Sequence, residues 1–177
     1  MPDLVRCWPT ADPAYLAYHD EEWGRPVRDE RGLYERLCLE GFQSGLSWLT
    51  ILRKRENFRA AFAGFDPDAV ARFGERDVER LLGDAGIVRH RGKIEAAIAN
   101  ARGVLALREA GTPLPEVMWE YVDAADAKEL SKRLKSAGFR FVGPTTAYAA
   151  MQACGIVNDH VANCWVREDV ERARRAG

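Results

Sequence analysis

The segment LLGDAGIVRHRGK (Leu81–Lys93) joins two helical patterns through a short turn that contains Gly86. The apolar side chains of Ile87 and Val88 follow the glycine and can pack between the two helices. A small residue at such a turn lets backbone N–H groups approach an anion, and the start of the next helix favours negative charge. The segment therefore predicts a helical hairpin.

Basic side chains follow this turn at Arg89, Arg91 and Lys93. Together with backbone N–H groups at Gly86 they favour a helix-hairpin-helix motif, which holds DNA through its phosphates without reading bases. An ordinary helical corner with solvated arginines is the alternative, and it is commoner in general. On the first interpretation all four residues contact DNA, with a charge contribution that weakens in salt.

Helical patterns also dominate the rest of the chain. Ser47 is a good N-cap, and the Asp66-Pro67 pair is typical of a helix start. Gly138 and Gly155 are candidate C-terminal caps, whereas 139–143 alternates too briefly to predict a strand. We expect helices over 31–42, 47–62, 66–73, 76–84, 91–110, 115–122, 126–137 and 144–154. An all-α fold follows.

The overall composition is that of an ordinary globular protein, with 47% hydrophobic and 30% charged residues in a chain of 177. The net charge of -1 does not by itself favour a nucleic-acid partner, although basic residues gather at 53–59 and 89–93. No apolar run approaches the roughly 20 residues that cross a bilayer, and the N-terminus lacks signal-peptide features. We expect a cytoplasmic protein with no membrane partner, whose four cysteines are free thiols or metal ligands.

Two cysteines and two histidines form a candidate metal site. His160 and Cys164 are spaced i, i+4, which would place both on one face of a helix, and Cys7 and His19 lie near the other end of the chain. This donor set suits tetrahedral zinc, and four protein ligands would make the zinc structural. The alternative is that these are unrelated core cysteines and surface histidines.

Glu40 lies in an apolar stretch and is accompanied by many aromatic residues. Such aromatics are usually packing residues, and most glutamates are solvated. As a group they could instead line a pocket for a flat cation, with Glu40 accepting hydrogen bonds from an exocyclic amine. The aromatic residues in question are Trp8, Tyr15, Tyr18, Trp23 and Trp48.

Four segments resemble the type I 3-methyladenine DNA glycosylases, in the same order along the chain. The resemblance covers most of 6–164 and is weak around 111–130 and after Cys164. The segments are DPAYLAYHDEEWG (Asp12–Gly24), LCLEGFQSGLSWLTILRKRENFRAAF (Leu37–Phe62), DAGIVRHRGKIEAAIANAR (Asp84–Arg102) and GFRFVGPTTAYAAMQACGIVNDHVANC (Gly138–Cys164).

This resemblance implies a helix-hairpin-helix glycosylase fold in one unit, 1–177, that works as a monomer. One lobe would carry the hairpin near 81–93, and the other would be formed by 1–25 and 155–177. A structural zinc ion would join the two ends of the chain. Its ligands would be Cys7, His19, His160 and Cys164.

The implied activity is hydrolysis of the N-glycosidic bond of 3-methyladenine in double-stranded alkylated DNA, leaving an abasic site. Glu40 would be the catalytic residue, with the base bound by Tyr18, Trp48, Tyr15 and Trp8. Gly45 and Leu46 would be wedged into the duplex. Phe42 and Ser44 differ from the residues of related proteins and could alter this region.

Two further features bear on the reaction. No Asp occurs between Asp84 and Asp123, where the wider superfamily usually has a catalytic one, and this matches the type I family. His90 stands where strand-cleaving members have a lysine, so lyase activity is not expected. A non-catalytic, zinc-stapled DNA-binding module and a glycosylase for oxidised or mismatched bases remain as alternatives.

Overall fold

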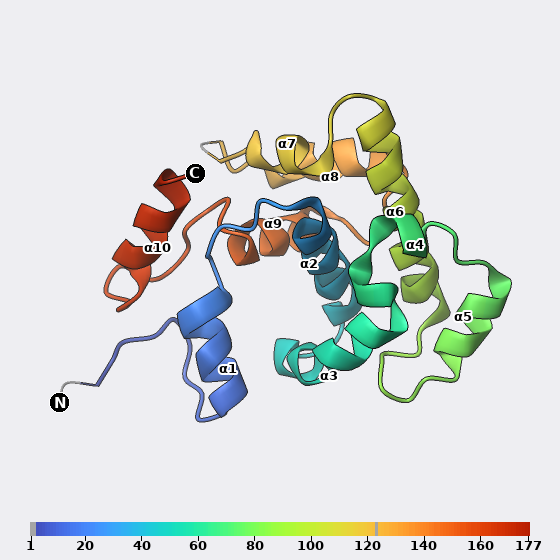
Figure 1. Cartoon of the computed structure of the whole chain (residues 1–177). Helices are drawn as coiled ribbons and strands as arrows, with labels where there is room; N and C mark the ends of the chain where they lie inside the picture. Colours follow the sequence, from blue (N-terminus) through green and yellow to red (C-terminus); the bar gives the residue numbers. More distant parts are fainter. Residues whose placement is uncertain (1–2, 123) are drawn as a thin grey trace.

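The computed structural model describes residues 3–122 and 124–177, and within them the regular structure is entirely helical (Figure 1). This agrees with the predicted all-α fold. Besides the π-helical turn η1 (Tyr18–Glu22) and the 3-10 turn η2 (Ala63–Phe65), the helices are α1 (Pro13–Ala17), α2 (Glu30–Gln43), α3 (Trp48–Ala61), α4 (Pro67–Val70), α5 (Glu75–Leu82), α6 (Arg91–Glu109), α7 (Leu114–Trp119), α8 (Ala127–Ser136), α9 (Pro144–Ala153) and α10 (Arg167–Arg175).

Helix α2 lies at the centre of the molecule and contacts α3, α6, α7 and α9 (Figure 1). Its residues Leu33, Tyr34 and Leu37 recur at helical spacing and are fully buried. The Tyr34 hydroxyl donates a hydrogen bond of 2.6 Å to the carbonyl of Ala97, which ties α2 to α6. Helix α2 is therefore packed among its neighbours and joined to α6 by a buried hydrogen bond.

Local capping rules located several helix ends correctly. The Ser47 hydroxyl accepts a hydrogen bond from the Thr50 N–H at 3.2 Å, and the Asp66 carboxylate accepts one from Asp68 at 3.0 Å. Gly138 and Gly155 follow the ends of α8 and α9 with positive φ angles of 101° and 78°. The predicted helices 66–73 and 115–122 are shorter than expected, because α4 ends at Val70 and α7 at Trp119.

The i, i+4 spacing of His160 and Cys164 does not lie on a helix. The segment between α9 and α10 is a loop, in which the Cys164 N–H donates to the carbonyl of Val161 at 2.9 Å. The side chain of Asn158 accepts from the His160 N–H at 3.3 Å and donates to the carbonyl of Arg167 at 3.1 Å. These side-chain bonds to the backbone compete with helix formation. Helices α1 and α10 were not predicted.

The segments near the two ends of the chain lie on the same side of the molecule, with α1 and α10 (Figure 1). The Trp165 N–H donates to the carbonyl of Val5 at 3.1 Å, and the Arg28 guanidinium donates to the carbonyl of Arg174 at 3.1 Å. Gly155 lies so close to the backbone of Gly24 that a Cβ would stand 2.6 Å from its carbonyl oxygen. In the part of the chain that is described, no helix has the length and apolarity to span a bilayer.

The hairpin between α5 and α6 places its apolar residues as predicted. Ile87 is 3% exposed and belongs to the core, and Val88 packs against it. The Gly86 backbone is already engaged, because its N–H donates to Asp84 at 2.8 Å and its carbonyl accepts from Asn57 at 3.1 Å. The Gly86 N–H was expected to bind a phosphate, but in this structure it is already bound to the Asp84 side chain.

The basic residues after the turn do not share one surface role. Arg89 is exposed, and among the described residues none forms an ion pair with it. Arg91 is surrounded by carboxylates, with N–O distances of 3.0, 2.5 and 3.4 Å to Glu75, Glu79 and Glu95. Its charge is therefore largely balanced within the protein.

Lys93 is 8% exposed and points into the protein, which corrects its expected place on the DNA-facing surface. Its Nζ atom donates to the carbonyls of Phe42 and Ser44 at 3.0 and 2.5 Å. These carbonyls lie at the C-terminal end of α2, where the helix dipole favours a cation. Lys93 thus fixes the start of α6 against the loop between α2 and α3.

We predict that Lys93→Met lowers the free energy of unfolding by about 1–3 kcal/mol, because it leaves the buried carbonyl of Phe42 without its donor. Urea unfolding followed by circular dichroism measures this. The matched control is Arg89→Met, which removes an exposed charge and should change stability by less than about 0.5 kcal/mol. Equal effects of the two substitutions would contradict the inward orientation of Lys93.

Candidate functional site

A cavity of about 190 Å³ opens between η1, α2, α3 and α9. A larger groove of about 520 Å³ between α6 and α8 holds no aromatic ring among its lining residues. The smaller cavity combines aromatic rings with a carboxylate, as predicted for a base pocket. Its lining residues are Trp8, Tyr15, Tyr18, Trp23, Glu40, Gln43, Trp48, Ala149 and Gln152.

The structure brings together all five residues predicted for the pocket, and adds others that the sequence did not reveal. Gln43 lies in the last turn of α2, three residues after Glu40, and its place in the cavity follows from that helical spacing. Ala149 and Gln152 come from α9, more than 100 positions further along the chain. No local pattern signals their approach, because it depends on the packing of α9 against α2.

The aromatic rings form a continuous series around the cavity. Ring centroids lie 5.2 Å apart for Trp8 and Tyr15, 6.4 Å for Tyr15 and Tyr18, and 5.3 Å for Tyr18 and Trp48. The indole nitrogens of Trp8 and Trp48 are buried and have no hydrogen-bond partner among the described residues. Buried donors without a partner are rare in proteins, so these two are available to a ligand.

Glu40 is 8% exposed and lies in the last turns of α2. Burial raises the pKa of its carboxyl group to about 7, although the positive charge of Arg36 opposes this shift. Within the described chain no backbone or side-chain donor forms a hydrogen bond with the Glu40 carboxylate. The group is therefore a largely buried acceptor that receives no hydrogen bond from the described residues, and only the nearby charge of Arg36 favours its ionised form.

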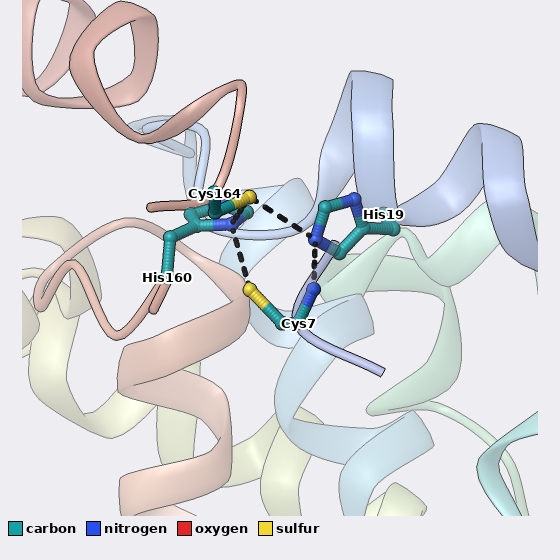
Figure 2. A group of neighbouring side chains, drawn as sticks. All are labelled: Cys7, His19, His160 and Cys164. Atoms are coloured by element: carbon teal, nitrogen blue, oxygen red, sulfur yellow. Dashed lines mark hydrogen bonds between the residues drawn. The ribbon is translucent and has the colours of Figure 1, made fainter. Parts of the chain in front are cut away.

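The metal-ligand candidates converge from three parts of the chain (Figure 2). All four ligand atoms of Cys7, His19, His160 and Cys164 lie within 4.8 Å of one another. The Nδ1 atom of His160 is 3.3 Å from the Cys7 sulfur and 3.4 Å from the Cys164 sulfur, and the His19 Nε2 is 3.6 Å from the latter. With Zn–S and Zn–N bonds of about 2.3 and 2.0 Å, such corners of a tetrahedron lie about 3.5 Å apart. The cluster could hold a metal ion of this size.

The outer nitrogens of both histidines have their own partners. The Nδ1 atom of His19 is 2.8 Å from a carboxylate oxygen of Asp20, and the Nε2 atom of His160 is 2.9 Å from the carbonyl oxygen of Trp23. Both contacts place the ring proton on the outer nitrogen, so the inner nitrogen is the unprotonated one that can ligate a metal. In this structure the inner Nε2 of His19 accepts a hydrogen bond from the Cys7 backbone N–H at 3.2 Å. Asp20 is held in turn by Arg6 at 2.8 Å and by the Trp165 indole at 3.1 Å.

The metal-ligand cluster and the cavity share a wall. Trp8 and Tyr18 directly follow and precede the ligands Cys7 and His19 in the chain. The rings of Trp8 and His19 meet edge-on with centroids 4.8 Å apart. The position of these cavity rings therefore depends on the joining of the two chain ends.

The residues predicted as a wedge lie in the loop between α2 and α3. Gly45 has a positive φ of 81°, which favours glycine, and Leu46 is 39% exposed. The amide of Gln43 donates to the carbonyl of Leu46 at 2.7 Å and so links this loop to the cavity. Phe42 does not alter the pocket rim, because its ring is buried in the core, 4.6 Å from that of Phe58.

Comparison with known proteins gives consistent results. The family model described as methyladenine glycosylase matches residues 8–168. The chain is 51% identical over 181 residues to DNA-3-methyladenine glycosylase 1 of Escherichia coli (strain K12), covering 91% of this chain and 96% of that protein.

Two solved structures are similar over nearly their whole length. A crystal structure of 3-methyladenine DNA glycosylase I has a TM-score of 0.87 and 49% identity, and the match covers 91% of this chain and 98% of that one. A variant of 3-methyladenine DNA glycosylase I in complex with 3-methyladenine has a TM-score of 0.85 and 38% identity, covering 89% and 94%. On this evidence, the chain belongs to the methyladenine glycosylase family.

Proposed function

We propose that this chain hydrolyses the N-glycosidic bond of 3-methyladenine in alkylated DNA and leaves an abasic site. The observation that carries the proposal is the largely buried carboxylate of Glu40, which has no hydrogen-bond donor among the described residues, in a cavity of aromatic rings. The names of the relatives and the base bound in one of the similar structures support it. Release of 3-methyladenine from methylated duplex DNA, identified by chromatography, tests it directly and separates it from non-catalytic binding.

Recognition of the base rests on its charge. Methylation at N3 makes adenine in DNA cationic, and the faces of Tyr18 and Trp48 attract a flat cation. Glu40 accepts hydrogen bonds from the exocyclic amine and faces the positive charge. Tyr15 and Trp8 complete the pocket, and the free indole N–H groups of Trp8 and Trp48 donate to acceptor atoms of the base.

The chemical step needs little acid catalysis. A cationic base is already a good leaving group, so no residue has to protonate it. The protein instead extrudes the nucleotide at a cost of a few kcal/mol, which damage reduces. Glu40 then stabilises the charge distribution as the bond breaks, and water replaces the base on the sugar.

Strand cleavage is not part of the proposed reaction. His90 caps the N-terminus of α6, where its Nδ1 accepts from the Lys93 N–H at 3.1 Å. The Lys93 ammonium is engaged by two backbone carbonyls and has no access to the cavity as a nucleophile. The enzyme is therefore monofunctional on this proposal.

On double-stranded DNA, Gly45 and Leu46 fill the space that the extruded nucleotide leaves, and Arg89 contacts a phosphate at the hairpin. Arg91 contributes less, because three carboxylates already balance its charge. We propose that one unit, 1–177, does this as a cytoplasmic monomer.

A zinc ion bound by Cys7, His19, His160 and Cys164 fits the donor set and the oriented histidines. When bound, it supplies a structural cross-link, since four protein ligands leave no open position for substrate. It fixes Trp8 and Tyr18 through their neighbours Cys7 and His19.

Glu40→Gln should leave the fold and metal content unchanged but weaken binding of free 3-methyladenine at least tenfold, because the charged acceptor is lost. Isothermal titration with the free base measures this. The control is Glu56→Gln on the exposed surface of α3, which should bind as wild type. Equal affinity of Glu40→Gln and wild type would refute the role of Glu40.

The reaction should also depend on pH through Glu40. Because burial raises the pKa of this group to about 7, it loses its charge as the pH falls through that value. We therefore expect kcat/KM to fall about tenfold per pH unit below neutrality and to level off above it. Measurement between about pH 5.5 and 8.5 checks this. A wild-type profile as flat as that of Glu40→Gln would contradict it.

Removing the metal should lower the free energy of unfolding on the order of 4 kcal/mol, because the metal cross-link between the two chain ends closes a long loop. Cys164→Ser should lose bound zinc in elemental analysis and show a lower Tm. Cys38→Ala, which alters a buried thiol outside the cluster, should retain one zinc per chain. Zinc-free wild-type protein with an unchanged Tm would rule out the structural role.

A further inference from the structure

Phe141 combines two unusual properties. It lies in the connector between α8 and α9 with a positive φ of 55°, a left-handed conformation that is uncommon for a bulky residue. It is also 42% exposed, which is high for an aromatic side chain. Strained backbone conformations are concentrated at functional sites, and an exposed ring is accessible to a partner.

Phe65 provides an internal comparison. It has nearly the same φ of 56°, but it is 0% exposed and its ring packs 5.6 Å from that of Phe62. Burial of the Phe65 ring offsets the cost of its backbone conformation. The Phe141 ring gains much less stabilisation from burial than the Phe65 ring does. Packing alone therefore does not account for a phenylalanine at this position.

The surrounding chain imposes the Phe141 conformation. Asn100 in α6 is 2% exposed and binds both backbone groups of the preceding residue, Arg140. Its Oδ1 accepts from the Arg140 N–H at 2.7 Å, and its Nδ2 donates to the Arg140 carbonyl at 3.2 Å. The following residue, Val142, is fully buried. Phe141 is therefore held between two anchored residues.

The ring lies where the hairpin meets the end of α2. It stands edge-on to His90, with centroids 6.1 Å apart, and a Cβ at Gly92 would be 3.8 Å from it. On its other side, a Cβ at Gly41 would be 3.4 Å from the Phe141 backbone oxygen. Gly41 directly follows Glu40.

We propose that Phe141 is a DNA-contacting residue. Its ring and that of His90, here called the Phe141–His90 platform, pack against a nucleotide of the duplex next to the hairpin. Aromatic faces bind unstacked nucleotides with little dependence on sequence, and extrusion of the damaged nucleotide opens the base stack beside it. The start of α6 favours the neighbouring phosphate. Exposed Arg89 adds an unpaired positive charge there. This inference rests on the proposed function, because it takes duplex DNA as the partner.

The test is the affinity of Phe141→Ala for a duplex that contains a tetrahydrofuran abasic-site analogue, measured by fluorescence anisotropy. We expect the Kd to rise about tenfold, the order of one lost aromatic–nucleotide contact. Binding of free 3-methyladenine should not change, because the Glu40 cavity is intact. Leu4→Ala is the matched control, since Leu4 is 50% exposed in the N-terminal segment and should not affect the Kd.

Phe141→Gly separates the platform from a structural role. Glycine accepts the left-handed conformation without strain, so the Tm should equal or exceed that of wild type while the Kd rises as in Phe141→Ala. An unchanged Kd in both variants would overturn the inference, as would a parallel loss of Tm and free-base binding.

Excision by the wild-type protein keeps the two proposals apart. Wild-type protein that binds the duplex but releases no base defeats the proposed function and leaves the platform supported by the variants. Wild-type protein that releases 3-methyladenine, with Phe141→Ala binding the duplex equally well, defeats only the platform.

Discussion

The junction between the two chain ends constrains the rest of the site. Cys7 and His160 are 153 positions apart, yet their ligand atoms lie 3.3 Å from each other. The junction is reinforced by ordinary contacts, such as the hydrogen bonds of the Trp165 backbone N–H to the Val5 carbonyl and of the Trp165 indole to Asp20. Because Trp8 and Tyr18 are sequence neighbours of two ligands, the same constraint that closes the chain also sets one wall of the cavity.

The cavity holds a carboxylate whose charged form is unfavourable when no ligand is bound. Glu40 lacks a hydrogen-bond donor among the described residues, and its charged form is opposed by burial. A cationic base in DNA would relieve this cost through its charge and through hydrogen bonds, whereas a neutral base could do so only through hydrogen bonds from its exocyclic amine. Stability is thus reduced locally at the position where selectivity for a charged ligand is required.

The distribution of charge around the hairpin bears on how a chain of net charge -1 would contact DNA, as proposed. Arg91 is balanced by carboxylates and Lys93 is turned inward, so much of the local positive charge serves the protein itself. The groups available on this surface are the backbone N–H groups at the start of α6, the exposed side chain of Leu46 and the exposed ring of Phe141. Contact by shape and stacking would depend less on salt than contact by many exposed cations.

The sequence determined what depends on near neighbours or on ligand chemistry. Caps at Ser47 and Asp66 mark helix starts because their hydrogen bonds span three residues or fewer. The cysteines and histidines were identified by donor type, by the spacing of His160 and Cys164, and by the resemblance to the glycosylase family. The inward turn of Lys93, the entry of Gln152 into the cavity and the strained Phe141 required the tertiary structure. Each of these depends on contacts between helices that are distant in the chain, and local periodicity carries no information about them.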